Sequence, residues 1–358
     1  MSSKKELERI RGQIDDLDKE LLKLLNLRST LARKAAKAKK DRVIYKSDRE
    51  ALIFRNLKRI NEGPLNDQQV NSIFKEIISS CRASEGKVEI SFLGPEGTYS
   101  DSAVKESFGS SISKNPTETI EDVFKIVETN KNNFGLVPIE NSTEGPINET
   151  LDCLSSYKLK ICGELEMKIH HSLIGLNKAL PREGFEIHAH EQTLAQCKRW
   201  LDSHCPKVKR ISVSSNAQAL VDATKNKKVL AIAGGLAAEK YGLDVIKRNI
   251  EDYSNNTTRF ISIGNEEVDV TGYDKTSLII TTKNEPGALY KVLEPFNKNK
   301  LNLTHLAYRP SRVDNWNYSF FFDFEGHQND RRVKTLMEEL KEINVEIKIL
   351  GSYPKAES

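Results

Sequence analysis

Hydroxyl, amide and guanidinium side chains are concentrated in one short stretch, residues 254–264, which reads SNNTTRFISIG. The stretch places Asn255, Asn256, Thr257 and Thr258 before Arg259, and an apolar run follows. These groups donate hydrogen bonds and carry positive charge, as a site for a polar or anionic ligand requires. They can equally form a loop in which Asn and Thr side chains bond their own backbone. The rest of the chain has to decide between the two interpretations.

Cations also interrupt an apolar seam near the N-terminus. From Leu7 to Leu24 apolar residues recur at steps of three and four, and Arg28 occupies the next seam position. On one helix Lys39 lies three turns further, so both cations point the same way about 16 Å apart. Arg11 lies about 25 Å before Arg28 and is rotated by about 100°, so it can share a small ligand only from another chain. A charged seam residue can instead set helix register or extend to solvent.

Three helices are expected to carry these cations. The repeat of apolar residues predicts one long first helix. A single helix cannot bury its own apolar stripe, so a partner helix is implied. The second helix starts near Ser47, which with Glu50 reads as a capping box. A third amphipathic helix runs from Val70 to about residue 85.

The middle and the end of the chain alternate strand and helix patterns. From residue 88 onward, short apolar runs separated by helical stretches predict an α/β unit whose ligands gather beyond the strand ends. Three polar clusters lie at such ends, at residues 94–100, 138–142 and 257–260. Each alone could be a turn or a helix cap. Residues 275–353 then read strand, helix, strand, strand, helix, strand, a ferredoxin-like order.

Composition and charge bound the possibilities. A chain of 358 residues suffices for two or three domains. Residues 1–60 hold 18 Lys+Arg against 9 Asp+Glu, and the remainder holds 37 against 42, so the basic part is a separate unit with an anionic partner. Five scattered cysteines without a C-x-x-C pair argue against a zinc site and for a reducing compartment. Without a signal peptide or membrane-length apolar run, we expect a cytoplasmic protein with no membrane partner.

The three helical segments resemble the all-helical chorismate mutase domain of the AroQ type. The likeness is carried by LERIRGQIDDLDKELLKLLNLRSTLARKAAKAKK, DREALIFRNLKR and IFKEIISSCRASE. It implies a pericyclic rearrangement that needs positioned cations and donors but no cofactor. The implied chorismate-binding residues are Arg11 (from the other subunit), Arg28, Lys39, Arg49, Glu50 and Glu85, of which Arg28, Lys39 and Glu85 are implied to be catalytic. Lys46 and Cys81 stand where some members have Asp and Ser.

The middle segment resembles prephenate dehydratase through FLGPEGTYS, GLVPIENSTEG and TTRF. The resemblance implies that Thr258 polarises or protonates the departing C4 hydroxyl while the ring carboxylate leaves as carbon dioxide. Arg259 would anchor a carboxylate or brace the loop. The implied prephenate-binding residues are Thr98, Glu140, Asn141, Ser142, Gln196, Thr258 and Arg259. Ala189 replaces a serine that is common in the family.

The C-terminal segment resembles the ACT regulatory domain. Gly287, Ala288 and Leu289 match one phenylalanine-binding motif of that family. Ala307-Tyr308-Arg309-Pro310 keeps only Arg309 and Pro310 of the second, which is usually Glu-Ser-Arg-Pro. The resemblance implies feedback inhibition by phenylalanine, and the alternative is a domain that only dimerises the chain.

Together the resemblances have the order of the bifunctional P-protein family. We therefore expect a multidomain chain with an all-α helical domain (1–86), an α/β periplasmic-binding-protein-like dehydratase domain (88–265) and an α+β ferredoxin-like ACT domain (274–353). It would convert chorismate to prephenate and prephenate to phenylpyruvate in phenylalanine biosynthesis. We expect a homodimer or higher homo-oligomer without metal, cofactor or nucleic acid.

Two alternatives remain open. One is a ligand-sensing transcription regulator with a basic nucleic-acid-binding head, although a long heptad helix fits a recognition helix poorly. The other is an enzyme with one active site, in which the helical part serves only for dimerisation.

Overall fold

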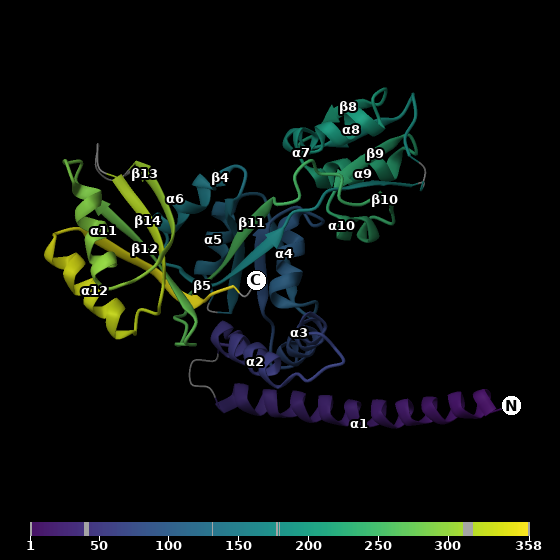
Figure 1. Cartoon of the computed structure of the whole chain (residues 1–358), viewed down its shortest axis with the longest axis horizontal. Helices are drawn as coiled ribbons and strands as arrows, with labels where there is room; N and C mark the ends of the chain where they lie inside the picture. Colours follow the sequence, from purple (N-terminus) through teal and green to yellow (C-terminus); the bar gives the residue numbers. More distant parts are fainter. Residues whose placement is uncertain are drawn as a thin grey trace. The chain divides into compact units, whose positions relative to one another are not determined.

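The computed structural model describes residues 2–38, 43–130, 132–176, 178, 180–310 and 318–356. The chain divides into two compact units, Met1–Glu89 with Phe108–Ser113 and Ile90–Ser107 with Lys114–Ser358. Figure 1 shows the helices and strands of both. Within the described ranges, no helix combines the length and apolar character that a membrane crossing requires.

The first unit consists mainly of helices, as predicted. They are α1 (Ser2–Ala38), α2 (Ser47–Ile60) and α3 (Asp67–Ala83). Helix α1 is one unbroken rod (Figure 1). Its apolar seam is open in the single chain, where Leu17 is 65% and Leu24 62% exposed. Such a seam is stable in water only when another helix covers it.

Two helix starts differ from what the sequence predicts. The capping box predicted at Ser47 is wrong: Ser47 is already the first residue of α2, and the N-cap, Lys46, makes no side-chain cap bond. The carboxylate of Glu50 instead accepts a hydrogen bond from Arg82. A capping box does begin α3, where Asn66 accepts from the Gln69 N–H at 2.9 Å and its own N–H donates to the Gln69 side chain at 3.0 Å.

The second unit contains two mixed α/β sheets in its middle segment. The first sheet has the order β2-β1-β3-β11-β5 with β4 beside β3, and the second has the order β10-β6-β9-β7-β8. The strands are β1 (Glu89–Leu93), β2 (Ser113–Thr117), β3 (Asn133–Asn141), β4 (Gly145–Pro146), β5 (Lys160–Lys168), β6 (Ser172–Gly175), β7 (Glu186–Ala189), β8 (Lys209–Ser212), β9 (Val229–Ala233), β10 (Asp244–Lys247) and β11 (Thr257–Gly264). The apolar runs picked out from the sequence are all strands. The strands that it missed are β2, β4, β5 and β10; β4 has only two residues, and β2, β5 and β10 each contain charged or polar residues.

Helices flank these sheets along the chain. They are α4 (Tyr99–Phe108), α5 (Ile120–Glu128), α6 (Asn148–Ser156), α7 (Glu191–Gln196), α8 (Lys198–His204), α9 (Asn216–Lys225) and α10 (Gly235–Lys240). Helices α7 and α8 are separated along the chain by Cys197 alone, and both precede α9.

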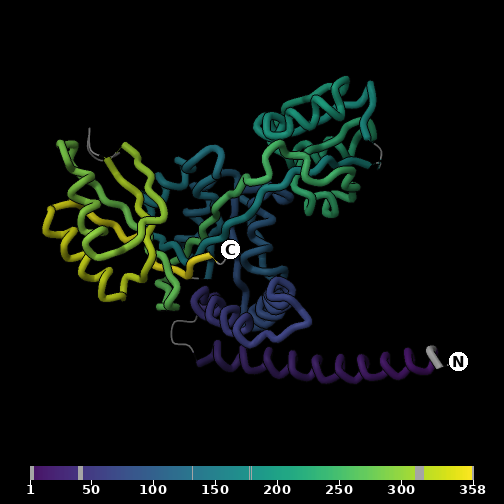
Figure 2. The backbone as a smooth tube through the Cα atoms, viewed as in Figure 1, coloured from purple at the N-terminus to yellow at the C-terminus, as the bar shows by residue number. Residues whose placement is uncertain are grey.

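The chain crosses between the two sheets twice (Figure 2). Residues 169–171 lead from β5 to β6, and residues 248–256 lead back from β10 to β11. The two crossing segments are hydrogen-bonded to each other, from Ile169 N to Asn256 O at 2.8 Å and from Ile250 N to His171 O at 2.9 Å. Two lobes joined by a double crossing are the layout of periplasmic-binding-protein-like folds, so the predicted fold class is confirmed.

The C-terminal segment forms a four-stranded antiparallel sheet with two helices. Its elements are β12 (Asp274–Thr282), α11 (Ala288–Lys298), β13 (Leu303–Pro310), β14 (Tyr318–Glu325), α12 (Arg331–Glu342) and β15 (Glu346–Pro354). The sheet order is β13-β14-β12-β15, which confirms the predicted ferredoxin-like arrangement.

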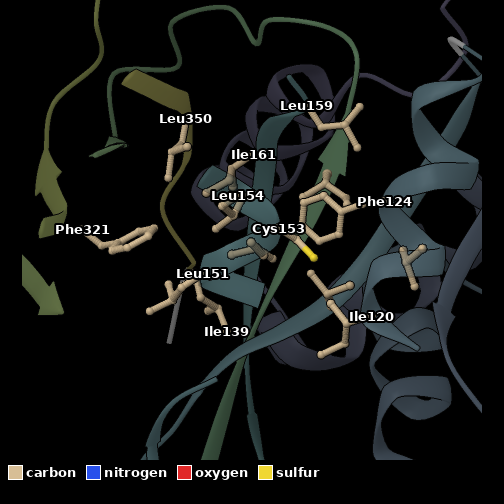
Figure 3. Packing of buried hydrophobic residues seen from close by; sticks show 14 of the residues in the cluster. Ile120, Phe124, Ile139, Leu151, Cys153, Leu154, Leu159, Ile161, Phe321 and Leu350 are labelled. Atoms are coloured by element: carbon tan, nitrogen blue, oxygen red, sulfur yellow. The ribbon is translucent and has the colours of Figure 1, made fainter. Parts of the chain in front are cut away.

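A single buried apolar cluster continues from the first sheet into the C-terminal sheet (Figure 3). Ile161 belongs to the first sheet and Leu151 to helix α6, whereas Phe321 and Leu350 belong to the C-terminal sheet. The backbones also approach closely at Gly351, where an added Cβ would lie 2.4 Å from the Ile161 carbonyl oxygen. The C-terminal sheet is therefore packed directly on the sheet that contains Thr258.

Candidate active site

The residues of two predicted motifs are brought together as neighbouring strands. In the antiparallel pair β11 and β3, Thr258 lies opposite Asn141 and Arg259 lies opposite Glu140. Successive side chains of a strand point to opposite faces. Thr258 and Asn141 therefore face one side of the sheet, and Arg259 and Glu140 face the other.

Thr258 and Asn141 belong to a chain of hydrogen-bonded side chains. The Nδ2 of Asn141 donates to Thr258 Oγ1 and to Asn256 Oδ1, both at 2.9 Å. The Nδ2 of Asn256 lies 3.4 Å from Gln196 Oε1. Thr258 is only 9% exposed and Asn256 5%, so these polar groups rely on one another rather than on bulk water.

The chain continues to a buried histidine that sequence reasoning missed. Nε2 of His171 lies 2.7 Å from Gln196 Oε1, and Nδ1 lies 2.6 Å from the Tyr99 hydroxyl. Burial lowers the pKa of His171, although Gln196 and the carboxylate of Glu251 act in the opposite direction. The imidazole is therefore neutral near pH 7. Both crossing segments and both lobes contribute to this chain.

Other predicted residues of this site have local partners. Ser142 Oγ accepts from the Thr257 N–H at 3.0 Å, and the Ser142 N–H donates to Thr257 O at 2.9 Å. Thr98 Oγ1 lies 3.4 Å from the Asp101 N–H in the first turn of α4. Ala189, at the end of β7, is fully buried. Ser142 and Thr98 thus hold the loops beside the hydrogen-bonded chain.

Comparisons with known proteins agree with this arrangement. A family model described as prephenate dehydratase matches residues 90–268, one described as chorismate mutase type II matches residues 10–86, and one described as ACT domain matches residues 276–342. A bifunctional chorismate mutase/prephenate dehydratase from Pseudomonas aeruginosa is 42% identical over 99% of this chain and 100% of its own length. This chain belongs to the bifunctional chorismate mutase/prephenate dehydratase family.

Two further relatives support the same assignment. The Aquifex aeolicus bifunctional enzyme is 40% identical over 98% of both chains. The crystal structure of the Arthrobacter aurescens prephenate dehydratase in complex with L-Phe has a TM-score of 0.66 and 30% identity, covering 75% of this chain and 90% of that one. The chain thus has chorismate mutase and prephenate dehydratase activities, with chorismate and prephenate as its substrates.

Arg259 and Glu140, which the sequence placed at the prephenate site, lie on the other face of the dehydratase sheet. Arg259 donates to Glu164 Oε2 at 2.9 Å, to Asp323 Oδ2 at 2.5 Å and to the Tyr353 hydroxyl at 3.0 Å. Burial raises the pKa of Asp323, but Arg259 and other partners outweigh it and hold this pKa below its usual value. These contacts hold the Arg259 guanidinium between strand β5 and the ACT sheet.

Glu140 likewise points toward the ACT segment. Its Oε2 lies 3.2 Å from Nδ1 of His305 on β13. The structure therefore brings together Asn141, Gln196 and Thr258 of the predicted prephenate-binding set, and it separates Glu140 from them.

In the mutase unit, a buried polar contact joins Glu50 to Arg82. Arg82 is 4% exposed, and its guanidinium donates to the Glu50 carboxylate and to the Phe108 carbonyl oxygen. It also lies over the Tyr45 ring, 5.2 Å from the centroid. Burial raises the pKa of Glu50, and the cations Arg82, Lys75 and Arg28 oppose that change. Sequence reasoning missed Arg82 because it reads as one more polar residue at a helix end.

The remaining predicted mutase residues are less enclosed. Arg28 is half-buried and close enough to act on the Glu50 carboxylate, whereas Arg11 and Arg49 are exposed. Glu85 is half-buried, and its N–H donates to the Arg82 carbonyl oxygen at 2.9 Å. Lys39 lies outside the described residues.

The two predicted phenylalanine motifs occupy different elements of the ACT segment. Gly287 has φ +82 and precedes α11, which begins at Ala288 and continues through the half-buried Leu289. Arg309, followed by Pro310 at the end of β13, donates to both oxygens of Asp152 on α6, at 3.1 and 2.9 Å. Arg309 thus links the ACT segment to the dehydratase segment.

Proposed function

We propose that the two activities reside at two separate sites, one in the helical unit and one at the double crossing of the dehydratase segment. The observation that carries the second assignment is the hydrogen-bonded chain that ends on Thr258. Its groups are neutral donors and acceptors held by neighbours, which suits a reaction driven by aromatisation and helped mainly by positioning. Thr258 would donate to the departing C4 hydroxyl, and Asn141 and Gln196 would orient prephenate.

The mutase site is proposed to contain Arg28, Lys39, Arg49, Glu50 and Glu85, with Arg11 from a second chain. Cations suit this reaction because chorismate carries two carboxylates and negative charge grows on its ether oxygen as the C–O bond breaks. The exposed seam of α1 supports a homodimer, since a second copy would cover the leucines and supply Arg11. Lys46 and Cys81 border this site in place of the Asp and Ser of some relatives.

One assay tests both assignments. Chorismate is added to the full-length protein, and chorismate loss and phenylpyruvate formation are followed together. Thr258→Ala should abolish phenylpyruvate formation and leave prephenate to accumulate, whereas Arg28→Ala should slow chorismate loss. Thr281→Ala is the matched control, because among the described residues its hydroxyl bonds only to Ser319 in the C-terminal sheet. A Thr258→Ala enzyme that still makes phenylpyruvate at the normal rate would refute the dehydratase site.

We further propose that the ACT segment regulates the dehydratase in response to phenylalanine. The Arthrobacter aurescens relative was crystallised with L-Phe, and Gly287, Ala288, Leu289, Arg309 and Pro310 are the candidate ligand-binding residues here. Millimolar phenylalanine should slow phenylpyruvate formation. An absent response would leave dimerisation as the role of this segment.

The domain limits and the location belong to the same proposal. We place the mutase at residues 1–86, the dehydratase at 88–265 and the ACT domain at 274–353. A cytoplasmic location suits five buried cysteines that are thiols rather than disulfides.

A further inference from the structure

The chain of side chains at Thr258 has a definite hydrogen-bond direction. Asn and Gln oxygen and nitrogen atoms, and the two nitrogens of His, are distinguished only by their partners. One partner has an unambiguous role as donor: the backbone N–H of Thr143 lies 3.0 Å from the side-chain oxygen of Asn141. A backbone N–H can only donate, so this atom of Asn141 is the acceptor. The other arm of the amide, which faces Thr258 and Asn256, must be its NH2 group.

The direction then propagates away from Thr258. Since Asn141 donates, Asn256 presents its oxygen to Asn141 and its NH2 group to Gln196. Gln196 must accept through Oε1, and the same atom lies 2.7 Å from His171 Nε2. His171 Nε2 must therefore carry the proton.

The neutral ring of His171 leaves Nδ1 as an acceptor. The Tyr99 hydroxyl, 2.6 Å away, supplies the matching proton. This hydroxyl also lies 3.0 Å from the His170 carbonyl oxygen, which it would use if the whole chain ran in reverse. The Thr143 N–H excludes that reversal. The carboxylate of Glu251 accepts from the His171 backbone N–H at 2.9 Å and from His170 Nδ1 at 2.7 Å.

At the other end, the direction determines what Thr258 can do. Its oxygen accepts from Asn141, so its own hydrogen is left over, and the described residues offer it no acceptor. The NH2 group of Gln196 likewise has no acceptor among the described residues. Two hydrogen-bond donors are thus available to a substrate that has a leaving hydroxyl and carboxylates.

We propose that His171 and Asn256 are positioning residues of the dehydratase: they hold the Gln196 oxygen in the direction that the Thr143 N–H sets at Asn141, so that the Gln196 NH2 group is presented to prephenate beside the Thr258 hydrogen. This inference rests on the proposed dehydratase site. In the reaction, the C–C bond to the ring carboxylate breaks and releases CO2. Its electron pair enters the ring, and the C4–O bond breaks with its own pair. The leaving oxygen takes one proton, supplied overall by solvent, and departs as water. A hydroxyl that donates stabilises this oxygen, whereas one turned toward Asn141 could not.

The first test reads the proton on His171 directly. The full-length protein is labelled with 15N-histidine, and the His171 signals are assigned by their loss in His171→Gln. At pH 7 we expect a protonated Nε2 and an unprotonated Nδ1. An Nδ1–H ring or a doubly protonated ring would overturn the proposal, whatever the kinetics show.

The second test compares His171→Gln with His171→Leu. The Gln amide can place an NH2 group near the position of Nε2, so we expect kcat for prephenate within about threefold of the parent. Leu offers no donor and should lower kcat by about tenfold or more. The chorismate mutase activity of the same preparations shows whether each chain is folded. Equal losses in both variants, or none in His171→Leu, would overturn the positioning role.

Failure of the proposed site would look different. In that case Thr258→Ala itself would retain dehydratase activity. An inactive Thr258→Ala together with a fully active His171→Leu would overturn only the inference about His171.

Discussion

Thr258 and Arg259 are adjacent in strand β11, and their side chains leave the strand on opposite faces. The Thr258 hydroxyl accepts from Asn141 at 2.9 Å, whereas the Arg259 guanidinium donates to Asp323 of the ACT sheet at 2.5 Å. Thr258, which carries the candidate catalytic hydroxyl, is thus the direct chain neighbour of the residue that contacts the ACT segment. The opposing pair Asn141 and Glu140 repeats the arrangement on β3, since Glu140 contacts His305.

Removing the Arg259 guanidinium should destabilise the protein strongly. In Arg259→Met, the buried carboxylates of Asp323 and Glu164 lose a cation, and breaking such a buried pair costs roughly 3–5 kcal/mol in free energy of unfolding. Urea denaturation measures the change. The control is Arg210→Met, whose ion pair with Asp202 is partly exposed and is expected to contribute less than about 1 kcal/mol. Equal losses in the two variants would contradict the structural role of Arg259.

The contact between His305 and Glu140 should carry part of the regulatory signal. His305→Gln removes a partner of Glu140 on β13 without touching the Thr258 chain. We expect dehydratase activity without effector to stay near that of the parent, while inhibition by phenylalanine weakens severalfold. Calorimetric titration with phenylalanine separates lost binding from lost coupling. Binding and inhibition that both match the parent would show that this contact transmits nothing.

The elements of the fold follow from sequence patterns more completely than the contacts of the site do. The apolar runs that became β3 and β11 are continuous, because both faces of these strands are covered, and Asn141 and Thr258 fall where these runs meet polar residues. Strand alternation predicts that Thr258 and Arg259 point apart. Which face meets the ACT sheet is decided by tertiary packing, so the partners of Arg259 could not be predicted.

Polar contacts between residues far apart in the chain also could not be predicted from the sequence. His171 and Tyr99 are 72 residues apart, and no local pattern distinguishes this histidine from His170. Tyr99 and Asn256 do lie within motifs singled out from the sequence. Glu50 was misread as part of a capping box because its partner, Arg82, is 32 residues away on another helix.

The dehydratase segment should become less stable as the pH falls below the ordinary pKa of histidine. Burial lowers the pKa of His171 in the folded protein below its ordinary value of 6.5. As pH falls, the unfolded chain therefore takes up this proton first. The stabilisation is complete above about pH 6.5 and is lost as pH falls toward the lowered folded-state pKa. Thermal unfolding at pH 7.5 and 5.5 should show a larger drop for the parent than for His171→Gln, and equal drops would contradict the assignment.

The ion pair of Arg82 and Glu50 should matter to the mutase alone. Arg82→Met keeps much of the apolar contact with Tyr45 but leaves the Glu50 carboxylate without its guanidinium. We expect kcat/KM for chorismate to fall by about tenfold or more, because a positioned group is lost, while prephenate turnover is unchanged. Arg59→Met is the control, since Arg59 is exposed and, in the part of the chain that the structure describes, donates only to Asn56. A parallel loss of both activities would mean that the variant perturbs the whole chain.

Gly351 should tolerate no side chain, because two backbones meet there. Its φ of +151 lies in a region that residues with a Cβ rarely adopt, and an added Cβ would lie 2.4 Å from Ile161 O on β5. Gly351→Ala must therefore separate β15 from β5 or strain both strands, at a cost of about 1–3 kcal/mol or more. The midpoint of urea unfolding and the phenylalanine response should both decrease. Gly272→Ala is the control, because that glycine also has a positive φ, +84, but nothing within 4 Å of the added atom. If Gly351→Ala lowers the free energy of unfolding no more than Gly272→Ala does, then backbone conformation alone explains the need for glycine at position 351. Close packing of the two sheets at this point would then be contradicted.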